Sequence, residues 1–154
     1  MASYDAHVTW TRDPDVGPSP RYRRAHEWRF DGGAVIPASP SPHIVPEPYS
    51  NPALVDPEEA FVASLSSCHM LFFLHLAQDA GFPVASYADR AVGTMAAIEN
   101  GEQTMTHVRL SPAVTYVAET PSAEAEAELH DAAHHKCFIA NSVKTQIEIS
   151  LPSR

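Results

Sequence analysis

Two cysteines are the residues of this chain whose type could do chemistry together. Cys68 lies in a long apolar stretch, and Cys137 follows two histidines and a lysine. If the two thiols meet in the fold, one thiolate can attack a substrate and the other can resolve the oxidised product as a disulfide. The simpler alternative is that both are small buried side chains, the usual fate of a free cysteine. Composition alone leaves both interpretations open.

Residues 56–81 carry Cys68 and are predicted to form the central helix. Asp56 and Pro57 suit the N-cap and the first helical position, and Gly81 followed by Pro83 suits the end. Nearly every residue between these ends is apolar or small, so we expect the helix to be buried on nearly every side. Its serines and histidines make it too polar for a typical membrane span.

The rest of the chain is predicted to supply strands and one more helix. Residues 7–11, 24–30 and 34–36 alternate as strands do, and the turn at 31–33 joins the last two as a hairpin. Residues 37–52 hold six prolines and should form an irregular, extended wrap. Strand-like runs at 86–98 and 104–117 are joined at Asn100 and Gly101, and Pro112 should mark a bulge or an edge position in the second run. A thin surface helix at 121–135 and a last strand at 142–151 follow. This order predicts an α+β fold with a mainly antiparallel sheet.

Length and charge narrow the class of protein. With 154 residues the chain is expected to form one domain, 1–154, divided into strands and wrap (1–55), central helix (56–81) and a C-terminal part (82–154). The formal net charge of −9 argues against a nucleic-acid partner. Polar residues follow Met1, so we expect no secretion signal, a cytoplasmic location and no membrane partner.

Two cysteine blocks resemble those of the OsmC/Ohr family of osmotically induced and organic hydroperoxide resistance proteins. The first runs from Asp56-Pro-Glu-Glu to Ser-Ser-Cys68-His-Met, and the second is Lys-Cys137-Phe-Ile-Ala-Asn-Ser-Val. The segments Arg24-Ala-His-Glu-Trp-Arg-Phe-Asp-Gly-Gly and Met105-Thr-His-Val-Arg-Leu-Ser-Pro fit the same frame. The chain is most similar to the OsmC-like branch, because Phe138 follows the second cysteine where the Ohr branch typically has proline.

The resemblance implies a thiol-dependent peroxidase that reduces organic hydroperoxides, and hydrogen peroxide more weakly, in the oxidative stress response. It implies an OsmC-like fold, with antiparallel sheets wrapped around long central helices in an intertwined homodimer. Cys68 would be the peroxidatic cysteine and Cys137 the resolving one, linked by a redox-active disulfide. Glu58 matches the family's active-site glutamate. Arg24 is the best match for its activating arginine, with Arg23 and Arg29 as alternatives.

The chemistry needs these residue types. An ordinary thiol is mostly protonated at neutral pH, and an arginine can stabilise its thiolate because the guanidinium stays charged. The carboxylate of Glu58 would hold that guanidinium in place. The apolar side chains of Phe61, Leu65 and Phe72 would favour a hydroperoxide with a hydrocarbon tail. No bound cofactor is expected, and an external dithiol, of the lipoyl type or another thiol, would reduce the disulfide.

Helix geometry bears on the assembly. Ten residues of helix rise about 15 Å, so Glu58 cannot reach Cys68 of its own chain on one straight helix. A second copy packed antiparallel across a twofold axis would bring Glu58 of one subunit towards Cys68 of the other. This agrees with the homodimer that the resemblance implies.

The second cysteine has a different setting from the first. Cys137 follows a helix C-terminus, whose partial negative charge disfavours a thiolate, and this suits a resolving role. His134, His135 and Lys136 are expected on the solvated surface.

Two rival readings concern metals and ligands. Nine histidines raise the question of a metal site, but none has the paired spacing of a zinc site, and we expect no metal. His69 is interpreted as a packed helix residue. A small-ligand-binding or redox-sensing protein of the same fold, with little peroxidase turnover, is the alternative function.

Overall fold

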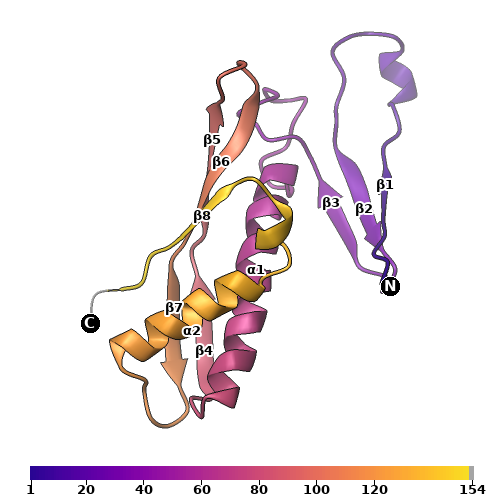
Figure 1. Ribbon diagram of the computed structural model, residues 1–154. Helices are drawn as coiled ribbons and strands as arrows, with labels where there is room; N and C mark the ends of the chain where they lie inside the picture. Colours follow the sequence, from indigo (N-terminus) through magenta and orange to yellow (C-terminus); the bar gives the residue numbers. More distant parts are fainter. Residues whose placement is uncertain (153–154) are drawn as a thin grey trace. The chain divides into compact units, whose positions relative to one another are not determined.

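The computed structural model describes residues 1–152 and forms two compact units, residues 1–60 and residues 61 onward (Figure 1). Residues 153 and 154, the last two of the predicted domain, lie outside the described part. The elements follow in the order β1, β2, β3, α1, β4, β5, β6, β7, α2 and β8, with two short 3-10 helices, at Pro14–Val16 and Ala140–Ser142. The two helices and the strands fit the predicted α+β class with mainly antiparallel sheets, since four of the five strand pairings are antiparallel and only β6 and β8 run parallel.

The first unit contains a three-stranded antiparallel sheet of β1 (Ala6–Thr9), β2 (His26–Phe30) and β3 (Val35–Ala38). The predicted hairpin between β2 and β3 is confirmed, and Gly33 takes the positive φ of 88° that its turn requires. The predicted start of the proline-rich wrap is wrong by two residues. Pro37 lies within β3 opposite Glu27, at a sheet edge where a missing N–H is tolerated.

The rest of the proline-rich segment contains no helix or strand, as predicted. It is fixed instead by hydrogen bonds around Ser39, which is fully buried. The Ser39 hydroxyl accepts from the backbone N–H of Asn51 at 2.8 Å, and the Ser39 N–H donates to the carbonyl of Val55 at 3.0 Å. These bonds bring the end of the wrap back to β3 immediately before α1 begins.

Helix α1 (Pro57–Asp79) begins at the predicted first helical position and ends two residues before the predicted Gly81. Asp56 accepts from the N–H of Glu59 at 2.7 Å, and the Glu59 carboxylate accepts from the N–H of Asp56 at 3.2 Å. This reciprocal pair satisfies two backbone donors at the helix start. Gly81 has a φ of 87° and ends the helix.

The prediction that α1 is buried on nearly every side is wrong within this chain. One stripe is buried, at Leu65, His69, Phe73 and Ala77, which recur every four residues. The opposite stripe is exposed, and Leu71 in it is 61% exposed. By length and composition alone α1 could cross a membrane, a test that core helices of globular proteins also pass. The exposed stripe comprises Ser64, Ser67, Leu71, His75 and Gln78.

A long interrupted hairpin supports α1 in the second unit. It consists of β4 (Val84–Asp89), β5 (Val92–Ala97), β6 (Gln103–Leu110) and β7 (Pro112–Tyr116), with β4 paired to β7 and β5 to β6. The predicted turn at Gly101 is confirmed by its φ of 84°. Pro112 marks a break between β6 and β7, where Asp89 accepts from the N–H of Ser111 at 2.6 Å and from the Ser66 hydroxyl of α1 at 2.5 Å.

Helix α2 (Ala123–Lys136) and strand β8 (Gln146–Ile149) complete the second unit. Ser122 caps α2 by accepting from the N–H of Ala125 at 3.1 Å. β8 is shorter than the predicted 142–151 and pairs in parallel with β6. The predicted surface position of α2 is right in part only, because Glu126, His130 and Ala133 are buried. One core cluster joins Phe73 and Ala77 of α1 to Ala133 of α2.

Candidate active site

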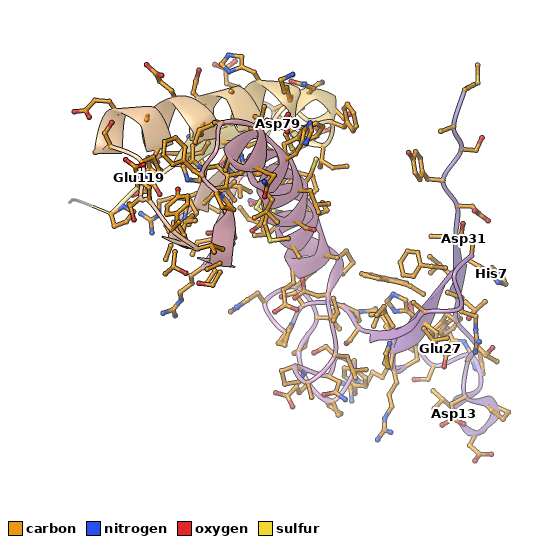
Figure 2. The ribbon with its side chains drawn as sticks, turned by 90° about the horizontal axis from the view of Figure 1, so that it is seen from below. His7, Asp13, Glu27, Asp31, Asp79 and Glu119 are labelled. Carbon is orange, nitrogen blue, oxygen red and sulfur yellow. The ribbon has the colours of Figure 1, made fainter. Side chains whose placement is uncertain are left out.

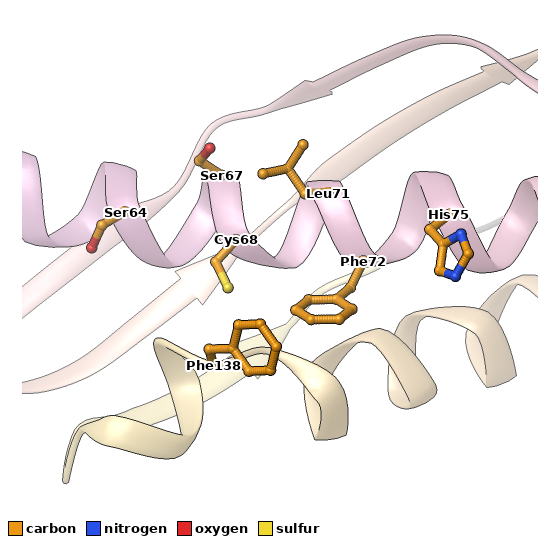
Figure 3. Close-up of a pocket in the computed structure, with 7 residues that line it drawn as sticks. All are labelled: Ser64, Ser67, Cys68, Leu71, Phe72, His75 and Phe138. Carbon is orange, nitrogen blue, oxygen red and sulfur yellow. The ribbon is translucent and has the colours of Figure 1, made fainter. Parts of the chain in front are cut away.

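Cys68 lies near the middle of α1 and lines a pocket of about 500 Å³ (Figure 3). Its side chain is partly exposed, and its sulfur points towards the segment that follows α2. Position 68 is one residue before the buried stripe, so the helix turns it to the rim of the core and towards the pocket. The pocket is mainly apolar, and it is lined by Ser64, Ser67, Cys68, Leu71, Phe72, His75 and Phe138.

Cys137 is the C-cap residue of α2 and is 1% exposed. Its thiol is in hydrogen-bonding contact with Cys68, and both cysteines are free. The pKa of the Cys137 thiol is raised to about 11, first by burial and then by the hydrogen bond with Cys68. The N–H of Ala140 donates to its sulfur at 3.4 Å, which acts in the opposite direction. The structure therefore brings the two predicted cysteines together, with Cys137 on the buried side.

The apolar surroundings of Cys68 differ from the prediction. Phe61 and Leu65 point into the core with Val108 and do not line the pocket. Phe72 lines it as predicted, and Leu71 lies on the exposed stripe of the same helix. Phe138, which follows Cys137, meets Phe72 edge to face with ring centroids 5.0 Å apart. Sequence reasoning missed Phe138, although its position beside the second cysteine was the available signal.

The predicted arginine and its alternatives belong to the first unit. Arg24 is partly buried, and its guanidinium carbon lies 4.7 Å from the ring centroid of Tyr22. Arg29 is exposed and forms an ion pair with Glu27 on the same strand (Figure 2). Its Nη2 atom lies 2.7 Å from Oε2 of Glu27. Arg23 is exposed, and its carbonyl accepts from the indole N–H of Trp10 at 3.1 Å. Of the three predicted candidates, Arg24 alone holds its side chain against an aromatic ring.

Glu58 lies in the first turn of α1. Its Oε2 atom is buried and has no hydrogen-bond partner among residues 1–152. A buried carboxylate oxygen without a donor is costly, so this atom is suited to a donor supplied from outside the described chain. Because α1 runs unbroken from Pro57 to Asp79, the helical rise that separates positions 58 and 68 remains about 15 Å.

A buried histidine pair links α1 to α2, and the sequence predicted only one member of it. His69 is packed in the core as predicted, but its Nε2 atom lies 2.9 Å from Nδ1 of His130 on α2. The two rings are parallel within 5°, and the His130 ring also stacks on Phe73 with centroids 4.0 Å apart. Burial lowers the pKa of His69 to about 4 and that of His130 to about 3. Both rings are therefore neutral at pH 7 and unable to supply a cation to the thiols.

The described residues contain no group of three or more His, Cys, Asp or Glu side chains placed to hold a metal ion. His134 and His135 lie together at the end of α2, but His135 is exposed and contacts the carboxylate of Asp131 at 3.5 Å. Zinc sites normally use three or four protein ligands, so this cluster does not meet the requirement.

A family model described as OsmC-like protein matches residues 50–151, which include both cysteines, Glu58 and all of α1 and α2. The chain belongs to the OsmC-like family. No curated protein sequence matches the chain at a comparable level.

Solved structures extend this OsmC-like relationship over the whole chain. An OsmC-like protein of unknown function from Vibrio cholerae is 45% identical, with a TM-score of 0.96 over 99% of this chain and 100% of that one. An organic hydroperoxide resistance protein from Elizabethkingia anophelis is 20% identical, with a TM-score of 0.71 over 98% of this chain and 94% of its own. Another from Bacillus subtilis is 18% identical, with a TM-score of 0.64, covering 97% and 98%. The last two show that the OsmC-like fold is shared, and the first extends the likeness to sequence.

Proposed function

We propose that this protein is a thiol-dependent peroxidase that reduces organic hydroperoxides. The observation that carries the proposal is the arrangement of the two thiols: Cys68 opens into an apolar pocket while Cys137 contacts it from the buried side. A hydroperoxide can enter such a pocket with its hydrocarbon part against Phe72 and Phe138. The resolving thiol is then already in contact with the sulfur that becomes oxidised.

The reaction would proceed in two steps at Cys68. Its thiolate attacks the outer oxygen of the hydroperoxide, an S–O bond forms, the O–O bond breaks, and the alkoxide takes a proton and leaves as an alcohol. The Cys137 thiol then loses its proton and attacks the Cys68 sulfenic acid. An S–S bond forms, and the hydroxide takes a proton and leaves as water. An external dithiol returns both cysteines to thiols and is itself oxidised to a disulfide.

Supporting groups would come from Arg24 and Glu58. Arg24 would stabilise the Cys68 thiolate, because its guanidinium stays charged and can face an anion with several N–H donors. The unpartnered Oε2 of Glu58 supports its role as the carboxylate that orients this guanidinium. The helical rise between Glu58 and Cys68 is the reason to place Glu58 in the site of a second subunit.

A homodimer also accounts for the exposed stripe of α1. Ser64, Ser67 and Leu71 present small and apolar groups on a helix face that the described residues leave open. Helices with such faces are covered in stable proteins, and an antiparallel copy of the same helix matches the stripe about a twofold axis. The same pocket supports a second candidate, a small-ligand-binding or redox-sensing role, because an apolar pocket binds apolar molecules whether or not they react.

The test is consumption of cumene hydroperoxide by the purified full chain, with dithiothreitol and a lipoylated reductant in parallel. We expect turnover with at least one dithiol and none in Cys68→Ser. Ser150→Ala is the control, because Ser150 is exposed and does not line the pocket. It should keep turnover near that of the unmodified chain.

Two outcomes would count against the peroxidase. One is the absence of turnover with either reductant in a folded protein. The other is an equal rate in Cys68→Ser, which would show that the consumption does not need this thiol. A binding protein would instead retain affinity for an apolar fluorescent probe in Cys68→Ser while showing no turnover.

A further inference from the structure

An aromatic and cationic cluster lies in the first unit and includes Arg24, the arginine to which the proposed function gives a role. Trp10 and Tyr22 pack with ring centroids 5.5 Å apart. The guanidinium carbon of Arg12 lies 4.2 Å from the centroid of Tyr22 and 5.5 Å from that of Trp10. Arg24 approaches the same Tyr22 ring at 4.7 Å. Tyr22 therefore contacts two guanidinium groups at once.

The sequence spacing explains why these four residues meet. Trp10 and Arg12 are two positions apart, and so are Tyr22 and Arg24. The first pair follows β1 and the second precedes β2, and in each pair the arginine lies over the ring of its own partner. The indole N–H of Trp10 donates to the carbonyl of Arg23 at 3.1 Å and joins the two segments.

The two arginines of the cluster are held in different ways. Arg12 uses its Nη1 atom to donate to the carbonyls of Gly17 and Ser19, at 3.2 and 3.1 Å, so it fastens the loop between the segments. Arg24 is anchored through its backbone, where its N–H donates to the carbonyl of Tyr49 at 3.1 Å. Its side chain contacts Tyr22, and the hydrogen bond from Arg24 lowers the pKa of the Tyr22 hydroxyl.

Neither guanidinium of the cluster forms an ion pair with a carboxylate among residues 1–152. Arg29, in contrast, is neutralised by Glu27. Two like charges beside one ring repel each other, and an anion that meets Arg24 relieves that repulsion. The cluster is therefore suited to present a guanidinium with unused N–H donors to an anion.

We propose that Tyr22 is a positioning residue for Arg24: it holds the guanidinium in one orientation for the thiolate-stabilising role that the proposed function assigns to this arginine. This inference rests on the proposed peroxidase function. An arginine side chain has many rotamers, and fixing one of them before the thiolate forms reduces the entropy lost on forming the contact. The ring does so by attracting the guanidinium to its face, and the N–H groups that do not bond the Tyr22 hydroxyl can donate outwards.

The test measures the pH dependence of Cys68 alkylation by iodoacetamide in the full chain carrying Cys137→Ser, so that one thiol reacts. Arg24→Gln should move the midpoint of the alkylation profile to higher pH. Tyr22→Leu should move it in the same direction and lower kcat/KM for cumene hydroperoxide by about tenfold, measured with Cys137 present. Tyr22→Phe keeps the ring and should have a smaller effect. Tyr4→Leu is the control, because Tyr4 is 94% exposed.

A double variant separates positioning from a general loss of structure. Tyr22→Leu combined with Arg24→Gln should be no slower than Arg24→Gln alone, because Tyr22 would act only through Arg24. Additive losses in kcat/KM would overturn the inference. It would also be overturned if Arg24→Gln shifts the midpoint of the alkylation profile while Tyr22→Leu has the same midpoint as Tyr4→Leu. If Arg24→Gln itself leaves the midpoint unchanged, the arginine assignment of the proposed function fails instead.

Discussion

At the scale of single residues, the two cysteines differ because of where each side chain lies. Cys68 is partly exposed at the pocket, whereas Cys137 is buried at the end of α2. Burial raises the pKa of Cys137 to about 11, so at neutral pH it is a protonated thiol and a poor first nucleophile. The sequence predicted this asymmetry from the helix dipole. The structure assigns its largest part to desolvation, which no sequence pattern around Cys137 signalled.

This asymmetry predicts the outcome of removing each thiol. In Cys137→Ser, Cys68 should still react with one equivalent of cumene hydroperoxide and then stop as a sulfenic acid, because no second thiol condenses with it. In Cys68→Ser, Cys137 should remain reduced. Dimedone labelling followed by peptide mass spectrometry measures both. A dimedone adduct on Cys137 in Cys68→Ser would reverse the two roles.

At the scale of elements, α1 and α2 are joined by polar side chains that sequence reasoning could not assign to an interface. The buried positions 126, 130 and 133 of α2 have helical spacing, but two of them are Glu126 and His130. A search for apolar faces therefore finds a thin surface helix. Their burial depends on partners distant in sequence, such as His69, which lies 2.9 Å from His130.

Features set by local chain chemistry were predictable at this scale. Asp56 at the start of α1 and Gly101 in the long hairpin act through adjacent backbone, and both behave as predicted. The exposed stripe of α1 was not predicted, because an all-round apolar helix does not reveal which side is covered by its own chain. The contact of Cys68 with Cys137 came from family resemblance, since no local rule relates positions 69 residues apart.

The histidine pair predicts how stability depends on pH. Burial lowers the pKa of His69 to about 4; His134 lowers it further and Asp89 acts in the opposite direction. Burial also lowers the pKa of His130 to about 3, and His69 adds to this effect. In the unfolded chain both titrate near 6.5. Above that pH both states are neutral, and stability is fully present. As pH falls towards 4, the unfolded chain binds protons that the folded chain does not, so stability is lost.

Urea denaturation at pH 7.5, 6, 5 and 4 measures this effect. We expect the free energy of unfolding to be flat above about pH 7 and to fall by about 3 kcal/mol for a shift of the size seen for His69. His130→Gln removes one titrating ring and should reduce the slope. His75→Gln is the control, because the His75 side chain is 68% exposed, and its slope should match that of the unmodified chain. An unchanged slope in His130→Gln would contradict the assignment.

At the scale of the whole molecule, the described chain leaves open surfaces that a second copy would cover. The exposed stripe of α1 is one, and Leu71 at its centre is 61% exposed. The first unit exposes further large apolar side chains, among them Val8 and Ile44 at 59% and 62%. Large apolar side chains left exposed in a single chain are a feature of proteins that bury them against a partner. The unpartnered Oε2 of Glu58 suggests that the interface also supplies a donor.

A complementation experiment tests whether Glu58 acts across such an interface. Cys68→Ser and Glu58→Gln subunits are each expected to have little activity as homodimers. Unfolding them together in equal amounts and refolding should make about half of the dimers mixed. In a mixed dimer, one site combines the intact Cys68 of one subunit with the intact Glu58 of the other, and the second site carries both substitutions. Activity should therefore recover to about a quarter of that of the unmodified protein, as twofold symmetry requires.

If Glu58 acts on the thiol of its own chain, no mixed site has both groups, and activity should stay at the level of the separate variants. A protein that sediments as a folded monomer and has full peroxidase activity would contradict the shared site more directly. Glu58 and Cys68 of one chain would then have to meet despite about 15 Å of helical rise.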